Sequence, residues 1–178
     1  MNKYEFNYDY LRAVAPAVSK EETRYYLGGV YVHDDEEGRH YVATNGHILL
    51  HILDSNISGE KLPDKGLIIK SKFKDFKNNN FILNFATQID NQTIVFGSGE
   101  NSEIASIIDA DYPDYWRVIP ENLKSIKTYR LLNSRFLKIA ENFMHGLSNT
   151  LTTEEDNGCS PVVWKKDNMT VVLMPMRD

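Results

Sequence analysis

One pattern of predicted elements occurs three times along the chain, and it constrains the fold more than any other feature of the sequence. Each copy is predicted to contain a strand, a helix and three further strands, and the copies begin near residues 3, 66 and 126. Three short helices cannot enclose a core of this size alone, so the strands must supply most of it. The sequence therefore predicts an α+β fold built from repeated β-α-β-β-β units.

The first copy has clear start and turn signals. Apolar residues recur at helical spacing between Tyr8 and Val18, after the cap-like Asn7, and Pro16 is expected to kink or shorten this helix. The expected strands that follow cover residues 24–32, 39–43 and 48–53.

The other two copies repeat this order. In the second, Ser71 is expected to cap a basic helix over residues 72–77. Its expected strands cover residues 67–69, 81–86, 92–97 and 103–108. In the third, Asn133 and Ser134 are expected to cap a helix with an apolar stripe from Phe136 to Phe143. Its expected strands cover residues 127–132, 150–153, 161–165 and 169–174.

Composition and charge narrow the class of protein. A chain of 178 residues with 42% apolar and 25% charged residues is typical of one soluble globular domain, or of one domain and a fragment. A net charge of −5 argues against a generic basic nucleic-acid-binding protein, although it is compatible with a locally basic face. The single Cys159 cannot form an intramolecular disulfide. The apolar runs are too short for a signal peptide or a membrane span, so we expect a cytoplasmic protein without a membrane partner.

Motifs of the common enzyme classes are absent from the sequence. It has no phosphate-binding glycine loop, no nucleophile elbow and no two-metal carboxylate cluster. Among the five histidines, only His47 and His51 are close in sequence, and they lie in a strand-like run. We therefore expect no enzyme activity, no cofactor and no metal site.

Four short motifs are more specific than the general pattern. They are residues 24–27 (RYYL), 43–47 (ATNGH), 112–120 (YPDYWRVIP) and 174–177 (MPMR). In this order and spacing they resemble the bacterial DNA polymerase sliding clamp, the β processivity subunit. That family's middle domain carries an Arg-Tyr-Tyr-Leu strand, a Thr-Asp-Gly-His turn and a Phe-Pro-Asp-Tyr segment, and its chain ends in Met-Pro-Met-Arg.

The resemblance implies a DNA-clamp fold of about three half-domains. Residues 1–120 resemble the family's complete middle domain, and residues 121–178 resemble the last half of its final domain. A family clamp has three similar domains of two halves each, so this chain would lack the first domain and half of the last. Single residues also depart from the pattern: Asn45 replaces the usual aspartate, Ile48 stands where an arginine is common, and Asp178 replaces an apolar residue.

The resemblance also implies a cleft that binds linear motifs of polymerases and other partners. Methionine and branched apolar side chains can accept the Leu and Phe anchors of a peptide, while Arg and His orient its polar end. The alternative is that residues 172–174 are only a buried strand and that His47 is only a turn residue. The matching cleft positions are Leu27, Thr44, Gly46, His47, Leu49, Pro113, Arg117, Val118, Val172, Leu173, Met174, Pro175, Met176 and Arg177.

A second surface implied by the resemblance is a basic inner face around duplex DNA. Lysine and arginine on the helices would contact phosphates without reading bases, whereas the alternative is a set of solvated helix faces. The candidate residues are Arg12, Lys20, Lys70, Lys72, Lys74, Lys77, Arg135 and Lys138.

These features lead to two main hypotheses of function. The first is a miniature processivity clamp, encoded by a phage or another mobile element, that encircles duplex DNA as a homo-oligomer and tethers a DNA polymerase, with or without a clamp loader. The family's rings contain twelve half-domains, so three per chain predict a tetramer. The second is a decoy or adaptor that keeps the cleft and does not encircle DNA, motivated by the loss of most of the last domain. A structural remnant without a partner is a third alternative.

Overall fold

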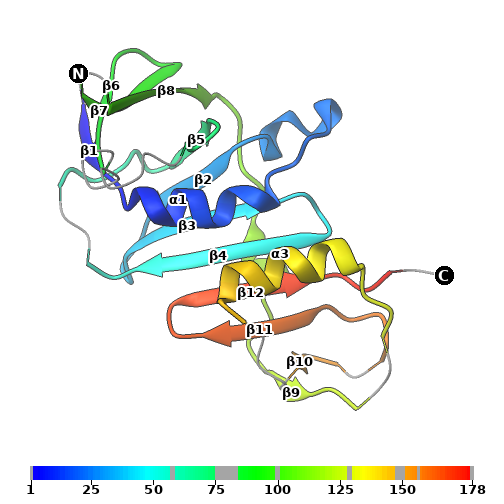
Figure 1. Cartoon of the computed structure of the whole chain (residues 1–178). Helices are drawn as coiled ribbons and strands as arrows, with labels where there is room; N and C mark the ends of the chain where they lie inside the picture. The colour runs from blue at the N-terminus through cyan, green and yellow to red at the C-terminus, as the bar shows by residue number, and fades with distance from the viewer. Residues whose placement is uncertain are drawn as a thin grey trace.

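The strands of the protein form one antiparallel sheet. A computed structural model of the chain describes residues 2–56, 59–74, 84–98, 101–127, 130–146, 151–155 and 157–176. The strands are β1 (Lys3–Glu5), β2 (Val30–Asp34), β3 (Arg39–Thr44), β4 (Ile48–Asp54), β5 (Leu67–Lys70), β6 (Phe85–Gln88), β7 (Thr93–Ser98), β8 (Asn101–Ile108), β9 (Lys124–Ser125), β10 (Thr152–Thr153), β11 (Val162–Lys166) and β12 (Met169–Leu173). Their order in the sheet is β1-β6-β7-β8-β5-β2-β3-β4-β12-β11-β10-β9 (Figure 1).

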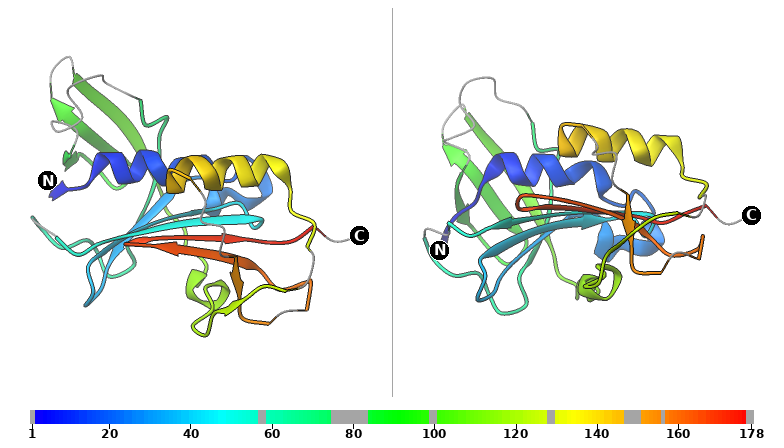
Figure 2. Two further views of the ribbon diagram at one scale, coloured as in Figure 1. Left: turned by 60° about the horizontal axis from the view of Figure 1, so that its bottom comes forward. Right: turned by 90° about the horizontal axis from the view of Figure 1, so that it is seen from below.

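Two α-helices lie on one face of this sheet. Within the described residues they are α1 (Tyr8–Val14) and α3 (Ser134–Met144), and they lie offset from each other, one beyond the other, over the central strands (Figure 2). Three short 3-10 helices connect other elements: η1 (Ala15–Ala17), η2 (Glu22–Leu27) and η3 (Tyr115–Val118). The segment that contains η3 lies on the opposite face, which we call the outer face.

Both α-helices begin where their capping residues predicted. The Asn7 side chain accepts a hydrogen bond from the Tyr10 amide at 3.2 Å, and that of Asn133 accepts one from the Arg135 amide at 2.9 Å. The first α-helix ends at Val14, and Pro16 lies in the 3-10 turn that follows. The predicted shortening by this proline is therefore confirmed.

The first two predicted units exchange strands. Lys3 of β1 pairs with Thr87 of β6, in the second unit, while β5 of the second unit pairs with β2 of the first. The third unit instead joins the sheet through its last strand, because β12 pairs with β4 along five residues. Segments that are far apart in sequence therefore meet in the middle of the sheet.

The central strands are buried on both faces. Ala43, Ile48 and Leu50 belong to the main core under the helices, while Val42 and Leu49 belong to a smaller cluster on the outer face. Alternate residues of a strand point to opposite faces, so double burial requires a nearly continuous apolar run. This explains why β3 and β4 have few exposed polar positions.

Three sequence predictions of local structure are wrong within the described residues. Residues 24–27 form part of η2 and not a strand, because the Gly28 amide closes a turn on the Tyr25 carbonyl at 2.9 Å. Residues 127 and 130–132 are irregular, and the strand lies earlier, at β9. Residues 71–74 are not helical, while 75–77 lie outside the described residues. The other predicted strands are confirmed, with ends shifted by a few residues or partly outside the described residues.

A buried carboxylate explains the non-helical path of residues 71–74. Glu103 of β8 accepts hydrogen bonds from the hydroxyl groups of Ser71 and Tyr8. It also accepts from the backbone amides of Phe73 at 2.9 Å and Lys74 at 3.0 Å. The Ser71 hydroxyl therefore bonds to a distant strand and does not cap a helix.

No helix in the described part of the chain is both long enough and apolar enough to cross a membrane.

Candidate functional site

An apolar pocket of about 180 Å³ opens on the outer face, where β4 and β12 meet η3. We call it the apolar pocket. Its lining residues are Leu27, Thr44, Gly46, His47, Ile48, Leu49, Pro113, Asp114, Tyr115, Val118, Val172 and Met174.

The floor of the apolar pocket comes from the paired strands β4 and β12. Leu49 and Val172 are direct partners in the antiparallel register, and both side chains are more than 95% buried. Tyr115 packs against the same cluster from η3. Because these residues belong to a close-packed core, the shape of the floor is fixed before any ligand binds.

A tight turn over residues 44–47 forms one end of the pocket. The Asn45 side chain accepts hydrogen bonds from the amides of His47 at 2.9 Å and Ile48 at 3.1 Å. Gly46 has a φ of +87°, and a Cβ there would lie 2.6 Å from the Arg24 guanidinium. The turn therefore requires glycine, and Asn45 supplies the side-chain acceptor where the family usually has aspartate.

The end of β12 is fastened to this turn. The Met174 amide donates to the His47 carbonyl at 2.9 Å. This hydrogen bond holds the side of the pocket that comes from the third unit against the side that comes from the first.

Nine of the fourteen predicted cleft residues line the apolar pocket. They are Leu27, Thr44, Gly46, His47, Leu49, Pro113, Val118, Val172 and Met174. Sequence reasoning missed Ile48, Asp114 and Tyr115, although the last two lie inside the motif over residues 112–120.

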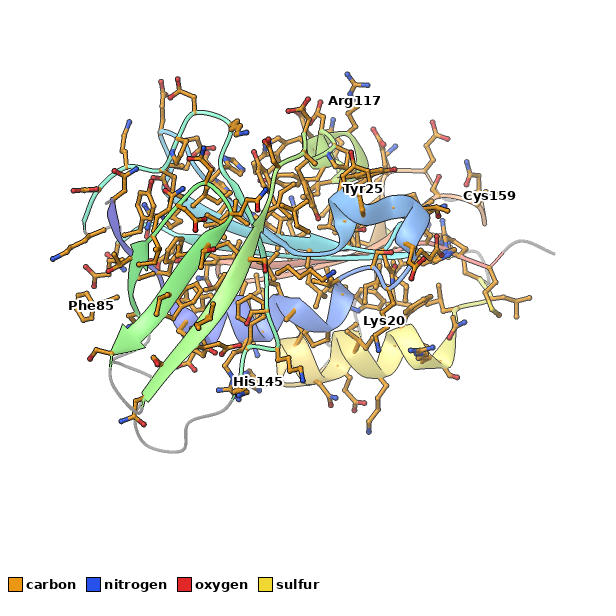
Figure 3. All side chains as sticks on the ribbon, turned by 90° about the horizontal axis from the view of Figure 1, so that it is seen from above. Lys20, Tyr25, Phe85, Arg117, His145 and Cys159 are labelled. Carbon is orange, nitrogen blue, oxygen red and sulfur yellow. The ribbon has the colours of Figure 1, made fainter. Side chains whose placement is uncertain are left out.

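The other predicted cleft residues lie elsewhere. Leu173 is wholly buried in the main core, because it alternates with Val172 and faces the helices. The Arg117 side chain is 83% exposed, pairs with Asp114 at 3.0 Å and projects from the surface near η3 (Figure 3). Pro175 and Met176 follow the strand without lining the pocket, and Arg177 lies outside the described residues.

Three histidines stack behind the wall formed by η3. They come from the adjacent strands β2, β3 and β4, and their rings are nearly parallel, with centroids 4.7 Å apart for His33 and His40 and 5.2 Å apart for His40 and His51. The hydroxyl of Tyr115 lies 2.9 Å from Nε2 of His33, and Trp116 contacts His40 and His51 edge-on. The sequence alone does not predict this cluster, because the three histidines lie on different strands.

Burial controls the protonation of this cluster. It lowers the pKa of His51 to about 3, with a further lowering from the neighbouring histidines. Burial is also the main cause that lowers the pKa of His33. The same effect raises the pKa values of Tyr112 and Tyr115, so both phenols stay protonated.

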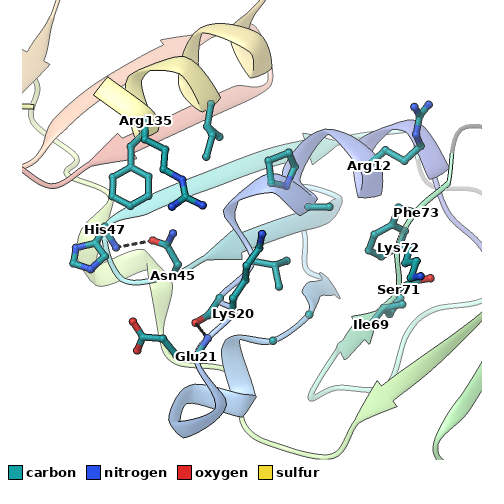
Figure 4. Close-up of a pocket in the computed structure, with 18 residues that line it drawn as sticks. Arg12, Lys20, Glu21, Asn45, His47, Ile69, Ser71, Lys72, Phe73 and Arg135 are labelled. Atoms are coloured by element: carbon teal, nitrogen blue, oxygen red, sulfur yellow. Dashed lines mark hydrogen bonds between the residues drawn. The ribbon is translucent and has the colours of Figure 1, made fainter. Parts of the chain in front are cut away.

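A second, larger cavity of about 810 Å³ lies on the helix face (Figure 4). Its walls come from η1, the segment before η2, residues 69 and 71–73 and the first turns of α3. Arg12, Lys20, Lys72 and Arg135 line it together with the acidic Glu21. We call it the basic cavity.

The basic cavity brings together four of the eight predicted DNA-contacting residues. Lys70, Lys74 and Lys138 are exposed but do not line the cavity, and Lys77 lies outside the described residues. Arg12 is within 3.4 Å of Asp9 on the same helix. His47 lines both cavities, and its ring stacks on Phe136 of α3 with centroids 5.6 Å apart.

Neither cavity has the features of a metal centre. Within the described ranges, no group of three or more His, Cys, Asp or Glu side chains is arranged to hold a metal ion. The site therefore consists of one apolar pocket and one basic cavity on opposite faces of the same sheet.

Comparison with known sequences gives a consistent family. A sequence model for the DNA polymerase III beta subunit, central domain, matches residues 6–114. The beta sliding clamp of Rickettsia bellii is 35% identical over 118 residues, which cover 61% of this chain and 30% of the relative. The chain spans about a third of the length of the curated relatives that it matches.

Solved structures share the fold over almost the whole chain. The Helicobacter pylori beta clamp bound to a DNA ligase peptide superposes with a TM-score of 0.73 and 15% identity, covering 98% of this chain and 65% of that one. A sliding clamp from Bartonella birtlesii bound to griselimycin gives 0.72 and 19%, covering 99% and 66%. At these identities the likeness is one of fold, and it confirms the predicted α+β clamp architecture.

Proposed function

The chain belongs to the family of the DNA polymerase III beta subunit, and we propose that it acts as a sliding clamp that binds linear motifs of partner proteins in the apolar pocket. The family consists of non-enzymatic processivity factors, in agreement with the prediction that the chain is not an enzyme. The observation that carries the proposal is the apolar pocket, which four separate segments of the sequence build together.

The chemistry of the apolar pocket suits a peptide anchor. Branched apolar residues form its floor, while the flexible Met174 lies at the side and can adapt to a leucine or phenylalanine side chain. The likeness to a clamp whose structure contains a DNA ligase peptide supports this choice of ligand. Peptides of a DNA polymerase are the partners that we expect first.

Calorimetry with a leucine- and phenylalanine-containing clamp-binding peptide tests the pocket. Met174→Ala and His47→Ala should each weaken binding by about 1–2 kcal/mol, the usual scale for an interface anchor. Met169→Ala, at the start of the strand that ends just before Met174, lies outside the pocket, is the matched control and should leave the affinity unchanged. Equal affinity of the folded Met174→Ala protein and the parent would contradict the assignment.

For DNA, we propose that the basic cavity contacts the phosphate backbone without sequence preference. Its four cations come from separate segments, and positive charge confined to one face agrees with a net charge of −5 for the whole chain. In a salt titration of duplex DNA binding, replacing both Lys72 and Arg135 with Ala should reduce the log–log slope by about two. Lys124→Ala, at the β9 edge, is the control. An unchanged slope in the double variant would contradict the contact.

We further propose that the chain closes a ring as a tetramer. Residues 1–120 would act as one clamp domain, and residues 121–178 as a half-domain that is completed by a neighbouring copy in a head-to-tail contact. Light scattering should then give a mass near 82 kDa, four times 20.5 kDa. The ring should stay on closed circular DNA and slide off after linearisation.

A decoy or adaptor is the second candidate. The observation that favours it is that the apolar pocket is lined by a single chain, so peptide binding does not require a ring. A mass near 20.5 kDa at every concentration, with peptide binding but no retention on circular DNA, would favour this function over the clamp.

A further inference from the structure

The histidine stack supports the wall of the apolar pocket, and this role goes beyond peptide binding itself. Two consecutive residues of η3 rest on it: the Tyr115 hydroxyl lies 2.9 Å from Nε2 of His33, and the Trp116 ring lies 5.3 Å from His40 and 5.5 Å from His51, measured between centroids. Tyr115 also lines the pocket, as do Pro113 and Val118 around it. The position of this wall therefore depends on contacts with the three imidazoles.

The protons in the stack can be assigned from its one acidic neighbour. Oδ1 of Asp35 lies 2.9 Å from Nε2 of His40. Partial burial opposes ionisation of Asp35, but hydrogen bonds from His40 and two backbone amides lower its pKa. The ionised carboxylate therefore favours the His40 tautomer that carries its proton on Nε2.

This assignment determines the rest of the chain of contacts. Nδ1 of His40 lies 2.9 Å from Nε2 of His51, so the first nitrogen accepts and the second donates. Nδ1 of His51 is then a bare, buried nitrogen, and the described residues offer it no hydrogen-bond partner. All three rings can therefore be neutral, although Nε2 of His40, at ion-pair distance from Asp35, also lacks a hydrogen bond of good geometry among the described residues.

An additional proton on His51 has no favourable place in the closed arrangement. It would be buried there without a hydrogen-bond partner among the described residues. The charged groups that act on the stack are Asp34 and Asp35 from the β2 end and Lys165 from β11, and the tyrosines are Tyr31 and Tyr115. The two aspartates favour protonation of His33, whereas Lys165 opposes that of His51.

We infer that the stack of His33, His40 and His51 is a pH-sensitive latch that holds η3 against the sheet and so keeps the η3 wall of the apolar pocket in place. We call this arrangement the closed state. The inference rests on the proposed peptide function of that pocket. When η3 separates from the sheet, the rings of His33 and His51 reach water and can accept protons with the ordinary histidine pKa of about 6.5. The closed state binds fewer protons than the open state. Its free-energy advantage over the open state is therefore complete above about pH 6.5 and declines as the pH falls below that value.

Peptide affinity measured against pH tests the latch. Between about pH 7.5 and about pH 5, the dissociation constant should rise by about tenfold, while circular dichroism still reports a folded protein. The double variant His33→Gln with His51→Gln should lose most of this dependence. His145→Asn, at the end of α3, is the matched control and should keep it.

His47 needs its own control because it is a further imidazole and lines the pocket. If His47→Gln abolishes the pH dependence while the double variant retains it, the latch is overturned. If His51→Gln prevents folding, the single variants His33→Gln and Tyr115→Phe test the latch instead through the contact between these two residues. Each of these variants should reduce the pH dependence of peptide affinity. If both retain it in full, the inference is overturned.

Fluorescence separates failure of the latch from failure of the proposed function. In a Trp164→Phe background, Trp116 is the remaining tryptophan, and it contacts His40 and His51. Without peptide, its emission should change over the same pH range and stay constant in the histidine variants. If the Trp116 emission changes with pH but no peptide binds at any pH, this supports the latch and contradicts the peptide function. A constant signal in the parent would overturn the latch.

Discussion

The two cavities of this protein differ in what fixes their walls. Buried side chains of paired strands build the apolar pocket, and removing any of them would disturb the core. Helix turns and loops that carry long, exposed cationic side chains line the basic cavity. The comparison suggests that shape controls binding on the outer face, whereas charge controls binding on the helix face.

The largest expected effect tests this difference through folding stability. Leu49→Ala should lower the free energy of unfolding by about 2–5 kcal/mol, because it leaves a void between β4 and β12. Lys72→Ala, in the basic cavity, should change it by less than about 0.5 kcal/mol. Urea unfolding of both variants measures the contrast. Leu131→Ala, which removes an exposed leucine, is the control for the side-chain change itself. Similar losses of unfolding free energy for Leu49→Ala and Lys72→Ala would contradict the proposed difference between the two cavities.

An intermediate effect is expected at Glu103, because a buried side chain holds this part of the basic cavity, as buried side chains hold the apolar pocket. The part of the basic cavity that includes Ser71 and Phe73 is held by the buried Glu103 carboxylate. Glu103→Gln replaces an accepting oxygen with a donating amide, so it should cost about 1–3 kcal/mol of unfolding free energy. Glu36→Gln, in the exposed acidic turn, should cost nothing measurable. A neutral Glu103→Gln would mean that this wall is as adaptable as the other walls of the basic cavity.

The smallest effect is expected at the rim of the apolar pocket. Arg117 and Asp114 form an exposed ion pair three residues apart, and such pairs contribute about 0–1 kcal/mol to stability. Arg117→Ala should therefore unfold at nearly the same urea concentration as the parent. A loss above about 1 kcal/mol would show that the pair fixes η3 and that the rim belongs to the rigid part of the molecule.

Local signals in the sequence were enough for the elements whose ends are set locally. Asn7 and Asn133 begin their helices because a side-chain acceptor satisfies the first amides in any fold, and Pro16 ends the regular helix for an equally local reason. The family motifs located most of the apolar pocket because its residues lie within them.

Features that depend on pairing between distant strands could not be predicted in this way. His51 meets His40 only because Val42 of β3 pairs with His51, a register that no local pattern gives. Ser71 looked like a helix cap because its true partner, Glu103, comes from a strand in the same unit but 32 residues away. Leu173 was assigned to the cleft along with its neighbours, although alternation along a strand turns it to the other face.

The position of β12 in the middle of the sheet has a consequence for synthesis on the ribosome. Leu49 of β4 is made before its partner Val172, which follows it by 123 residues in the sequence, from position 49 to position 172. At ordinary rates of translation, the edge of β4 that pairs with β12 stays unpaired for on the order of ten seconds. During this time an apolar strand edge is open to pairing with other nascent chains. Synthesis speed and chaperone supply should therefore control the yield of this protein more than its final stability does.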